Sequence, residues 1–456
     1  YGYSNSVDYL ATSSYTGDRT SHGTHVSTTI AAKNNNSYMN GYAVKALNIN
    51  VFFVAGSGAN AKPSGASDLN TTNAILYAAG LENSSGSIAP NTTPIKVINL
   101  SLGGEFYNAV TCAAINDAIS QGITVVAASG NEQDEEPGRI NYPAACPGVI
   151  SVGATNSGGG IASYSNQNIH VDITAPGGDS FDRDGNGLRD RILAFGDDFA
   201  TPFKALAQGT SMASPQVAAA IALMYSVDNS LTPSRVENML IAGELTNDKG
   251  DSGRDDVFGY GELNLPKAIQ NLFDDISNTT TYAYTSVPFL DFDDSTTQLT
   301  LDLLKVGDGA LSVSSLSADN ATGLTYNDSS ADSNGFGTYT ILIDRSSIPN
   351  GEFSNTIYFN LSSGDQVAVK IYYIVGSLRE RANIGKAYIA MYDASDDSLW
   401  GSLEAEVDGS VSFVANDVAP GNYYILTSTD IDNDNAVCDY GELCEYYPEY
   451  GETTYY

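Results

Sequence analysis

Short apolar segments alternate with helix-periodic segments along about the first 272 residues of this chain. Val97–Leu100 and Thr124–Ala128 are apolar at most successive positions, as buried parallel strands are, and residues 149–152 form a weaker third segment. Between the first two, residues 113–121 carry apolar side chains at helical spacing and end before Gly122. This order predicts an α/β domain with a mainly parallel sheet flanked by helices.

From about residue 280 onward the helical pattern gives way to β-strand segments separated by turn residues. Residues 299–303 and 367–371 alternate apolar and polar side chains, which is typical of strands that cover a core with one face. We therefore expect the α/β domain to occupy residues 1–273 and an immunoglobulin-like β-sandwich to occupy residues 280–375.

A third region, residues 376–456, contains further strand-like segments such as residues 388–392. Its Pro420-Gly421 turn before Tyr423 resembles the turn of transthyretin-like and carboxypeptidase-regulatory-like β-domains. We therefore expect a second β-sandwich domain here, although a shared fold of this kind implies little about activity.

The chain is strongly acidic, with 54 Asp and Glu residues against 20 Lys and Arg residues and a formal net charge of −34. Nucleic acids and anionic membrane surfaces bind clustered Lys and Arg, so this charge argues against both as partners. The longest nearly apolar run, residues 217–225, is far too short to cross a bilayer. We therefore expect a soluble, secreted protein without a membrane span.

Three polar segments lie where ligands gather in α/β proteins, at strand ends and helix N-termini. His22 opens one helical pattern, Ser211 opens a long apolar one, and Asn131 follows the strand at Thr124–Ala128. A histidine can accept a serine proton, and an asparagine amide can stabilise an oxyanion together with backbone N–H groups. Taken singly, however, a serine before a helix is usually an N-cap, and a lone histidine is usually structural.

Together and in this order, the segments Ser-His-Gly-Thr-His, Ser-Gly-Asn-Glu and Gly-Thr-Ser-Met-Ala-Ser-Pro resemble those of the subtilisin-like serine proteases, the subtilases. The similarity extends through residues 99–104, 142–147, 175–178 and 259–261, and so covers about the first 270 residues. The resemblance implies a subtilisin-like fold. It also implies roles for three residues: His22 as general base, Ser211 as nucleophile and Asn131 as oxyanion donor, with His25 as a structural companion of the base.

The resemblance further implies a binding site for a polypeptide substrate in an extended conformation. Ser101, Leu102 and Gly103 would form the edge strand that pairs with the substrate, and Gly130 would lie on the opposite wall of the primary specificity pocket. Main-chain pairing of this kind gives affinity with little choice of sequence.

The triad aspartate of subtilases lies upstream of the histidine, at the end of an apolar strand and before a small residue and a glycine. Upstream of His22 the chain offers only Asp8 and Asp18, and neither has that setting. We therefore expect the first strand and its acid to lie before Tyr1, on a cleaved or otherwise separate segment. Without the acid, the histidine loses its orienting partner, at a cost of about 10⁴ in kcat.

Two acidic loops have the alternating oxygen-bearing residues of an EF-hand-type calcium loop, although the first lacks a glutamate at position 12. We expect each loop to hold one structural Ca²⁺, and the alternative is that they are solvated acidic turns. The expected ligands of the first loop are Asp182, Asp184, Asn186, Leu188 through its carbonyl, and Asp190. Those of the second are Asp430, Asp432, Asp434, Asp439 and Glu442.

The four cysteines allow three pairings. Cys112 heads the helical segment and Cys146 lies in a loop before the next strand, whereas Cys438 and Cys444 flank the end of the second acidic loop. We favour the disulfides Cys112–Cys146 and Cys438–Cys444.

These observations predict a secreted, calcium-stabilised serine endopeptidase with two accessory β-domains. Its partners would be an extended polypeptide substrate and its own cleaved N-terminal fragment, and not nucleic acid. The alternative is a non-catalytic adhesive or filament-forming protein on a disabled protease scaffold, whose function would rest on self-assembly.

Overall fold

The computed structural model divides the chain into two compact units, Tyr1–Gly376 and Ser377–Tyr456. In the first unit it describes residues 22–32, 68–83, 95–182, 189–198, 201–277, 281–307 and 309–376. In the second it describes residues 386–393, 398–406, 422–430, 444–447 and 454–455.

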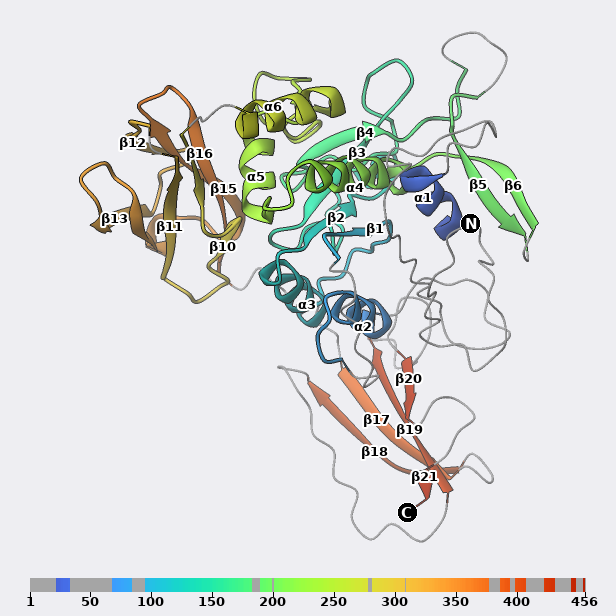
Figure 1. Cartoon of the computed structure of the whole chain (residues 1–456). Coiled ribbons are helices and arrows are strands. Elements are labelled where there is room, and N and C mark those ends of the chain that lie inside the picture. The colour runs from blue at the N-terminus through green and yellow to red at the C-terminus, as the bar shows by residue number, and fades with distance from the viewer. Residues whose placement is uncertain are drawn as a thin grey trace. The chain divides into compact units, whose positions relative to one another are not determined.

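A six-stranded sheet forms the centre of the α/β part of the first unit (Figure 1). Its strands, in spatial order, are β1 (Val97–Leu100), β2 (Thr124–Ala128), β3 (Ile150–Thr155), β4 (Ile173–Pro176), β8 (Glu262–Leu263) and β7 (Thr246–Asn247). All neighbours pair in parallel except β7 and β8, which are antiparallel. The prediction of an α/β fold with a mainly parallel sheet is confirmed.

Helices cover both faces of this sheet because its central strand is buried on both sides. In β2, Val126 packs into the core beneath α4, whereas Val125 and Ala127 pack into the core beneath α3. The helices are α1 (His22–Ala31), α2 (Asp68–Ala78), α3 (Ala109–Ser120), α4 (Thr210–Val227), α5 (Pro233–Ile241) and α6 (Leu265–Ser277). The last of these packs on the core through Ala268 and Leu272 and ends four residues beyond the expected domain end at 273, with Phe273 and Ile276 exposed.

A two-stranded hairpin, which the sequence pattern did not predict, lies beside α1. It consists of β5 (Ile192–Asp198) and β6 (Thr201–Ala207), paired antiparallel. Leu193 and Leu206 are 39% and 50% exposed, whereas Ala194 is fully buried, so the larger apolar side chains lie on the exposed side of the hairpin.

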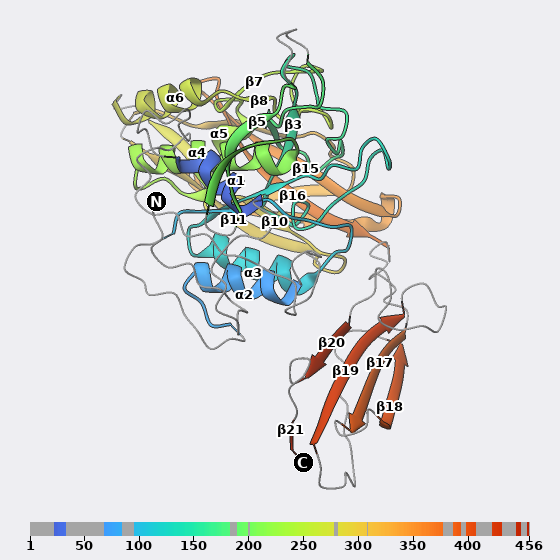
Figure 2. The same ribbon diagram turned by 90° about the vertical axis from the view of Figure 1, so that its right-hand side faces the viewer.

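The remainder of the first unit consists of two four-stranded sheets that enclose one hydrophobic core. One sheet has the order β10 (Phe289–Asp291), β16 (Gln366–Val375), β15 (Gly351–Leu361) and β12 (Val313–Ala318). The other has the order β13 (Leu324–Ala331), β14 (Gly337–Ile343), β11 (Gln298–Val306) and β9 (Tyr282–Thr285). Figure 2 shows these sheets from the side. We call residues 281–376, which follow the α/β part within the first unit, the second β region.

The described part of the second unit forms a single sheet. Its strands are β17 (Lys386–Asp393), β18 (Ser398–Glu406), β19 (Asn422–Asp430), β20 (Cys444–Tyr447) and β21 (Thr454–Tyr455). The order is β18-β17-β19-β20, and β21 also pairs with β19.

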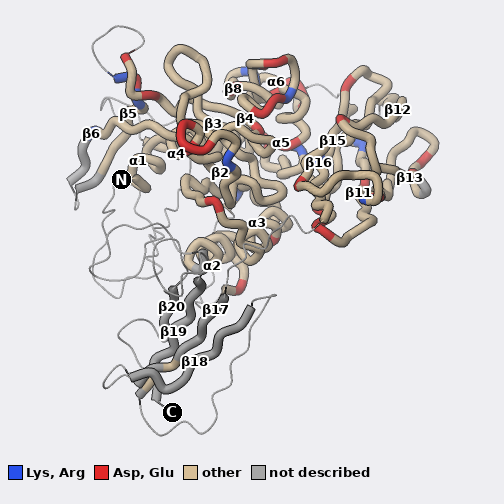
Figure 3. Tube along the Cα trace, turned by 180° about the vertical axis from the view of Figure 1, so that it is seen from behind, with Lys and Arg blue, Asp and Glu red and all other residues tan. Residues whose placement is uncertain are grey.

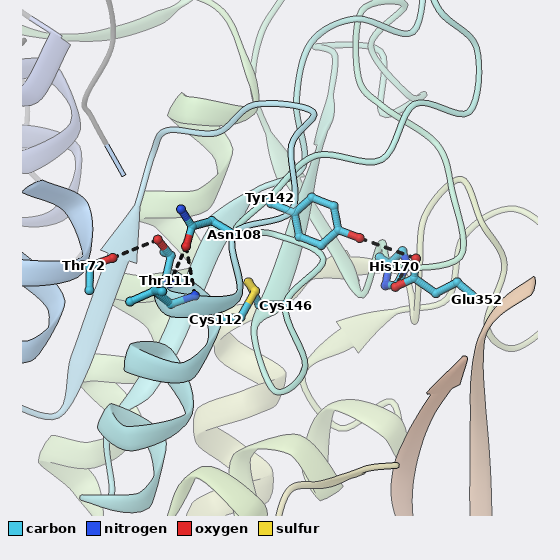
Figure 4. The surroundings of a disulfide bond; sticks show 9 residues. Thr72, Asn108, Thr111, Cys112, Tyr142, Cys146, His170 and Glu352 are labelled. Carbon is cyan, nitrogen blue, oxygen red and sulfur yellow. Dashed lines mark hydrogen bonds and ion pairs between the residues drawn. A yellow bond between two sulfur atoms is a disulfide. The ribbon is translucent and has the colours of Figure 1, made fainter. Parts of the chain in front are cut away.

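A disulfide joins Cys112 to Cys146, which is the pairing that the sequence favoured (Figure 4). It links the first turn of α3 to the turn before β3, and both cysteines are buried in the core beneath α3. The same turn of α3 is capped by the Asn108 side chain, which accepts hydrogen bonds from the backbone N–H groups of Val110 and Thr111.

We expect the double variant Cys112→Ala/Cys146→Ala to lose about 3–4 kcal/mol of unfolding free energy, because the bond closes a loop between residues 34 positions apart. Either single variant should lose about as much, since each breaks the same link. Denaturant unfolding measures the effect. Equal stability of the wild type and the double variant would contradict it.

Candidate active site

Ser211 lies at the second position of α4, two residues after the N-cap residue Gly209. Gly209 has φ +142°, a conformation that L side chains rarely adopt, so the turn into the helix requires glycine. Two contacts from the end of β4 hold this turn: Gly209 N donates to Gly177 O at 3.0 Å, and Gln216 Nε2 donates to Pro176 O at 2.6 Å. The serine is therefore fixed on a helix N-terminus, where backbone N–H groups favour negative charge.

Pro215 explains how the first turn of α4 is joined to the end of β1. Proline has no backbone N–H, so the Ser211 carbonyl lacks its usual helical donor four residues later. Ser101, just beyond β1, supplies a replacement, since its Oγ donates to Ser211 O at 2.9 Å. In return, Ser211 Oγ lies 3.4 Å from Ser101 O. The first residue of the predicted substrate strand thus touches the predicted nucleophile.

Asn131 is held in one orientation by Thr210, a residue that the sequence did not single out. Asn131 Oδ1 accepts from Thr210 N at 2.8 Å and from Thr210 Oγ1 at 3.1 Å. With the oxygen engaged by two donors, the amide nitrogen is the end of the side chain that can donate elsewhere. Thr210 is completely buried, and its Oγ1 also accepts from Gly130 N at 3.2 Å.

Ser211 N and the Asn131 amide border the same small space. A Cβ placed on Gly209 would stand 3.4 Å from Asn131 Oδ1, 3.7 Å from Ser211 N and 3.8 Å from Asn131 Nδ2. One is a backbone donor at a helix N-terminus and the other is a side-chain amide. Two such donors on one space form an arrangement that can stabilise a developing oxyanion.

His22 is the first residue of α1 and is exposed, and α1 contacts α4 (Figures 1 and 2). His25, one turn later, is 2% exposed, and its Nε2 lies 3.1 Å from Ile192 O on β5. Burial lowers the pKa of His25, which therefore stays neutral at neutral pH. His25 thus anchors α1 to the unpredicted hairpin, while His22 stands at the start of the helix.

A polar network lies behind Gly130 and was not predicted. The Glu132 carboxylate accepts from Asn131 N at 2.8 Å, and from the side-chain amides of Asn141 and Asn166 at 2.9 Å each. A Cβ on Gly130 would stand 2.3 Å from each of those two amide nitrogens, so only glycine fits there. The network ties the segment that carries Asn131 to its surroundings.

Acidic residues continue after this network, as the red segments of Figure 3 mark. Asp134, Glu135 and Glu136 follow within four residues of Glu132. Arg139 partly balances them, since its guanidinium lies 2.7 Å from Glu136 Oε2 and 3.0 Å from Glu105 Oε2. The loop beside the candidate site therefore carries net negative charge.

The structure describes only the two ends of the first predicted calcium loop. Asp190 N donates to Phe181 O at 2.9 Å, and Asp190 Oδ2 accepts from Ser157 Oγ at 2.5 Å, while Asp182 is exposed. Three predicted ligands, namely Asp184, Asn186 and Leu188, lie outside the described residues.

Most of the second predicted calcium loop also lies outside the described residues. Asp430 ends β19 and Cys444 begins β20. Outside the described part lie Asp432, Asp434, Cys438, Asp439 and Glu442. Within the described residues, no group of three or more His, Cys, Asp or Glu side chains is placed to hold a metal ion.

In a comparison with known protein families, residues 1–261 match the family model of the subtilases. An extracellular protease of Xanthomonas campestris is 39% identical over 224 residues, which cover 48% of this chain and 35% of that protein. The minor extracellular protease Epr of Bacillus subtilis is 33% identical, covering 57% of this chain and 34% of that protein. The chain thus spans about a third of the length of these two relatives. Subtilisin DY of Bacillus licheniformis is 32% identical over 272 residues, covering 58% of this chain and 83% of that protein.

Among solved structures, proteases from Pseudoalteromonas arctica match with 31% identity and a TM-score of 0.46, covering 55% of this chain and 70% of that one.

No helix in the described part of the chain is both long and apolar enough to span a membrane.

Proposed function

Because this chain belongs to the subtilase family, we propose that it is a secreted serine endopeptidase in which Ser211 attacks the scissile carbonyl. In this proposal His22 accepts the Ser211 proton and returns it to the leaving amine. Asn131 Nδ2 and the backbone N–H of Ser211 hold the oxyanion that forms on the carbonyl oxygen.

The observation that carries this proposal is the shared space between the two donors. Ser211 N and Asn131 Nδ2 each lie within 3.8 Å of one point beside Gly209. Thr210 fixes the amide so that its nitrogen is the available end. Donors held in place before the reaction stabilise the transition state without having to reorganise, which is the largest contribution in many enzymes.

The substrate would bind as an extended chain along residues 101–103. These residues follow β1, which stands at one end of the sheet among the strands that the structure describes. Gly130 would form the facing wall, backed by the Glu132 network. Recognition through the main chain predicts hydrolysis of unfolded polypeptides with modest sequence preference.

The test is hydrolysis of reduced, unfolded casein by a preparation of the full protein, including any sequence upstream of Tyr1 that supplies the triad acid. We expect release of soluble peptides, and we expect a serine-directed fluorophosphonate to abolish it. Absence of hydrolysis together with absence of covalent labelling would overturn the proposal and favour a non-catalytic adhesive or filament-forming protein.

We further propose that both acidic loops hold structural Ca²⁺. The described ends of the first loop fit this ion, because Asp182 and Asp190 present carboxylate oxygens and a backbone hydrogen bond from Asp190 N to Phe181 O closes the loop. Asp184, Asn186 and the Leu188 carbonyl would complete that site, and residues 430–442 would form the other.

Chelation should therefore lower the melting temperature. A site filled at a hundredfold excess of Ca²⁺ over Kd contributes about 2.7 kcal/mol to the folded state. We expect EDTA to lower the melting temperature by several degrees, added Ca²⁺ to restore it, and Asp182→Asn to reduce the EDTA effect. The melting temperatures are measured by calorimetry, and a melting temperature unchanged by EDTA would count against both calcium sites.

A further inference from the structure

Lys370 lies in the middle of β16, in the second β region, yet it is only 4% exposed. Its Nζ lies 2.6 Å from Asp172 Oδ1 and 2.6 Å from Glu237 Oε1. Both acids belong to the α/β part, since Asp172 precedes β4 and Glu237 lies on α5, and they are 3% and 6% exposed. A cation from one part of the unit is therefore the counter-charge of two carboxylates buried in the other.

The charges of this cluster depend on one another. Burial works against the charged ammonium, but the neighbouring Asp172 and Glu237 outweigh it, so the pKa of Lys370 lies well above its usual value. Burial also raises the pKa of Glu237, an effect that Lys370 partly opposes. Asp172 is bound further, because its Oδ2 accepts from Ser151 N at 2.9 Å. Arg254 also acts on Asp172. Removing only the lysine would therefore leave Glu237 without its contacting cation and Asp172 with less compensation, which is destabilising.

Beside the charge cluster, hydrogen bonds from one side chain to backbone groups hold the α/β part and the second β region in register. Asn238, the residue after Glu237 on α5, is 3% exposed. Its Nδ2 donates to Ala368 O on β16 at 2.6 Å, and its Oδ1 accepts from Thr285 N on β9 at 3.3 Å. One buried side chain thus satisfies backbone groups from both sheets of the second β region.

Close packing extends the interface toward the disulfide. Phe289 of β10 packs against the core beneath α3, and a Cβ on Gly148 would stand only 2.1 Å from its ring. At the rim, the His170 ring lies parallel to that of Tyr372 at 6.4 Å between centroids. Figure 4 shows Tyr142 and His170 near the Glu352 carboxylate, which accepts from Tyr142 Oη at 3.5 Å.

We propose that the second β region must pack on the α/β part of the same chain, and that Lys370 stabilises this packing by balancing the buried negative charges of Asp172 and Glu237. We call this ion-pair cluster the lock. The lock also supports the candidate site, because Asp172 lies at the start of β4 and the end of β4 holds the first turns of α4 through Gln216. This role is independent of the chemistry proposed for Ser211, since it concerns stability.

The experiment compares the melting of full-length variants by calorimetry in a Ser211→Ala background, which prevents self-digestion. Lys370→Met should lower the melting temperature of the unit by about 5–10 °C, because it removes the cation that contacts both buried acids, while Arg254 still acts on Asp172. Lys305→Met is the matched control: Lys305 is the other lysine of the second β region, it lies on β11, and its removal should change melting by less than about 2 °C.

A triple variant, Lys370→Met with Asp172→Asn and Glu237→Gln, separates charge compensation from a general packing defect. We expect it to recover at least half of the loss, since it removes the uncompensated charges while keeping similar side-chain volumes. If Lys370→Met does not fold, folding of the triple variant supports the lock. The proposal is overturned if Lys370→Met melts like Lys305→Met, or if the triple variant is no more stable than Lys370→Met alone.

Discussion

Ser211→Ala should lower the rate of casein hydrolysis by at least about 10⁴-fold, because alanine has no hydroxyl to form the covalent acyl intermediate. The fold should survive, since the contact of the Ser211 hydroxyl with Ser101 O is long, at 3.4 Å, and the side chain is not fully buried. The bond that joins the helix to Ser101 uses the Ser211 carbonyl, which alanine retains.

Ser226→Ala is the matched control for this variant. Ser226 lies on the same helix, one residue before its end, and its exposed hydroxyl donates only to Leu223 O. It should keep wild-type activity and a wild-type melting temperature. Equal loss of activity in both variants would point to a general effect on α4 and contradict the role of Ser211, as would full activity of Ser211→Ala.

Asn131→Ala should lower kcat by about 10²–10³-fold with little change in KM, because an oxyanion donor acts mainly on the transition state. The variant also removes the acceptor of the two hydrogen bonds from Thr210. Asn131→Asp tests the donor itself, since it keeps an acceptor for Thr210 but replaces the amide nitrogen by an oxygen. It should lose kcat at least as severely, because a carboxylate repels the oxyanion. Initial rates on a peptide substrate at several concentrations give kcat and KM separately.

Asn229→Ala is the control for a lost surface asparagine. Asn229 is exposed and lies two residues beyond the far end of α4, an 18-residue helix about 27 Å long. It should keep both constants. A rise in KM at unchanged kcat in Asn131→Ala would instead assign Asn131 to substrate binding.

Strands β1 and β2 could be predicted because both are mostly apolar; β2 is buried at every residue, whereas β1 is partly exposed at three of its four. Val97–Leu100 and Thr124–Ala128 match β1 and β2 residue for residue, since a continuous apolar run between loops leaves little choice. The start of α4 was harder. Its nearly all-apolar pattern begins near Ser214, whereas the helix begins at Thr210, and its first two residues are polar and contact Asn131 and Ser101.

The second β region shows where sequence periodicity misleads. Residues 367–371 alternate apolar and polar side chains, which predicts that Lys370 faces solvent. Most of β16 is instead buried on both faces. The side that carries Lys370 is covered by Glu237 of α5 and by Asp172, which directly precedes β4. Lys370 and Asp172 are 198 residues apart, so no local pattern could reveal that they pair.

The candidate site was predicted as a set of residues but not as a geometry. His22, Asn131 and Ser211 were identified by their motifs, whereas Thr210, Pro215 and the Glu132 network were not. These supporting residues act through contacts between distant segments, such as the bonds from Thr210 to Asn131 across 79 positions. Only the fold brings those segments together.

The most direct test of serine endopeptidase chemistry is to react the full protein with a fluorophosphonate probe and to locate the adduct by peptide mass spectrometry. We expect one adduct, on Ser211, retained in Ser226→Ala and absent from Ser211→Ala. An adduct on another residue, or none in a preparation that contains the upstream sequence, would contradict the account.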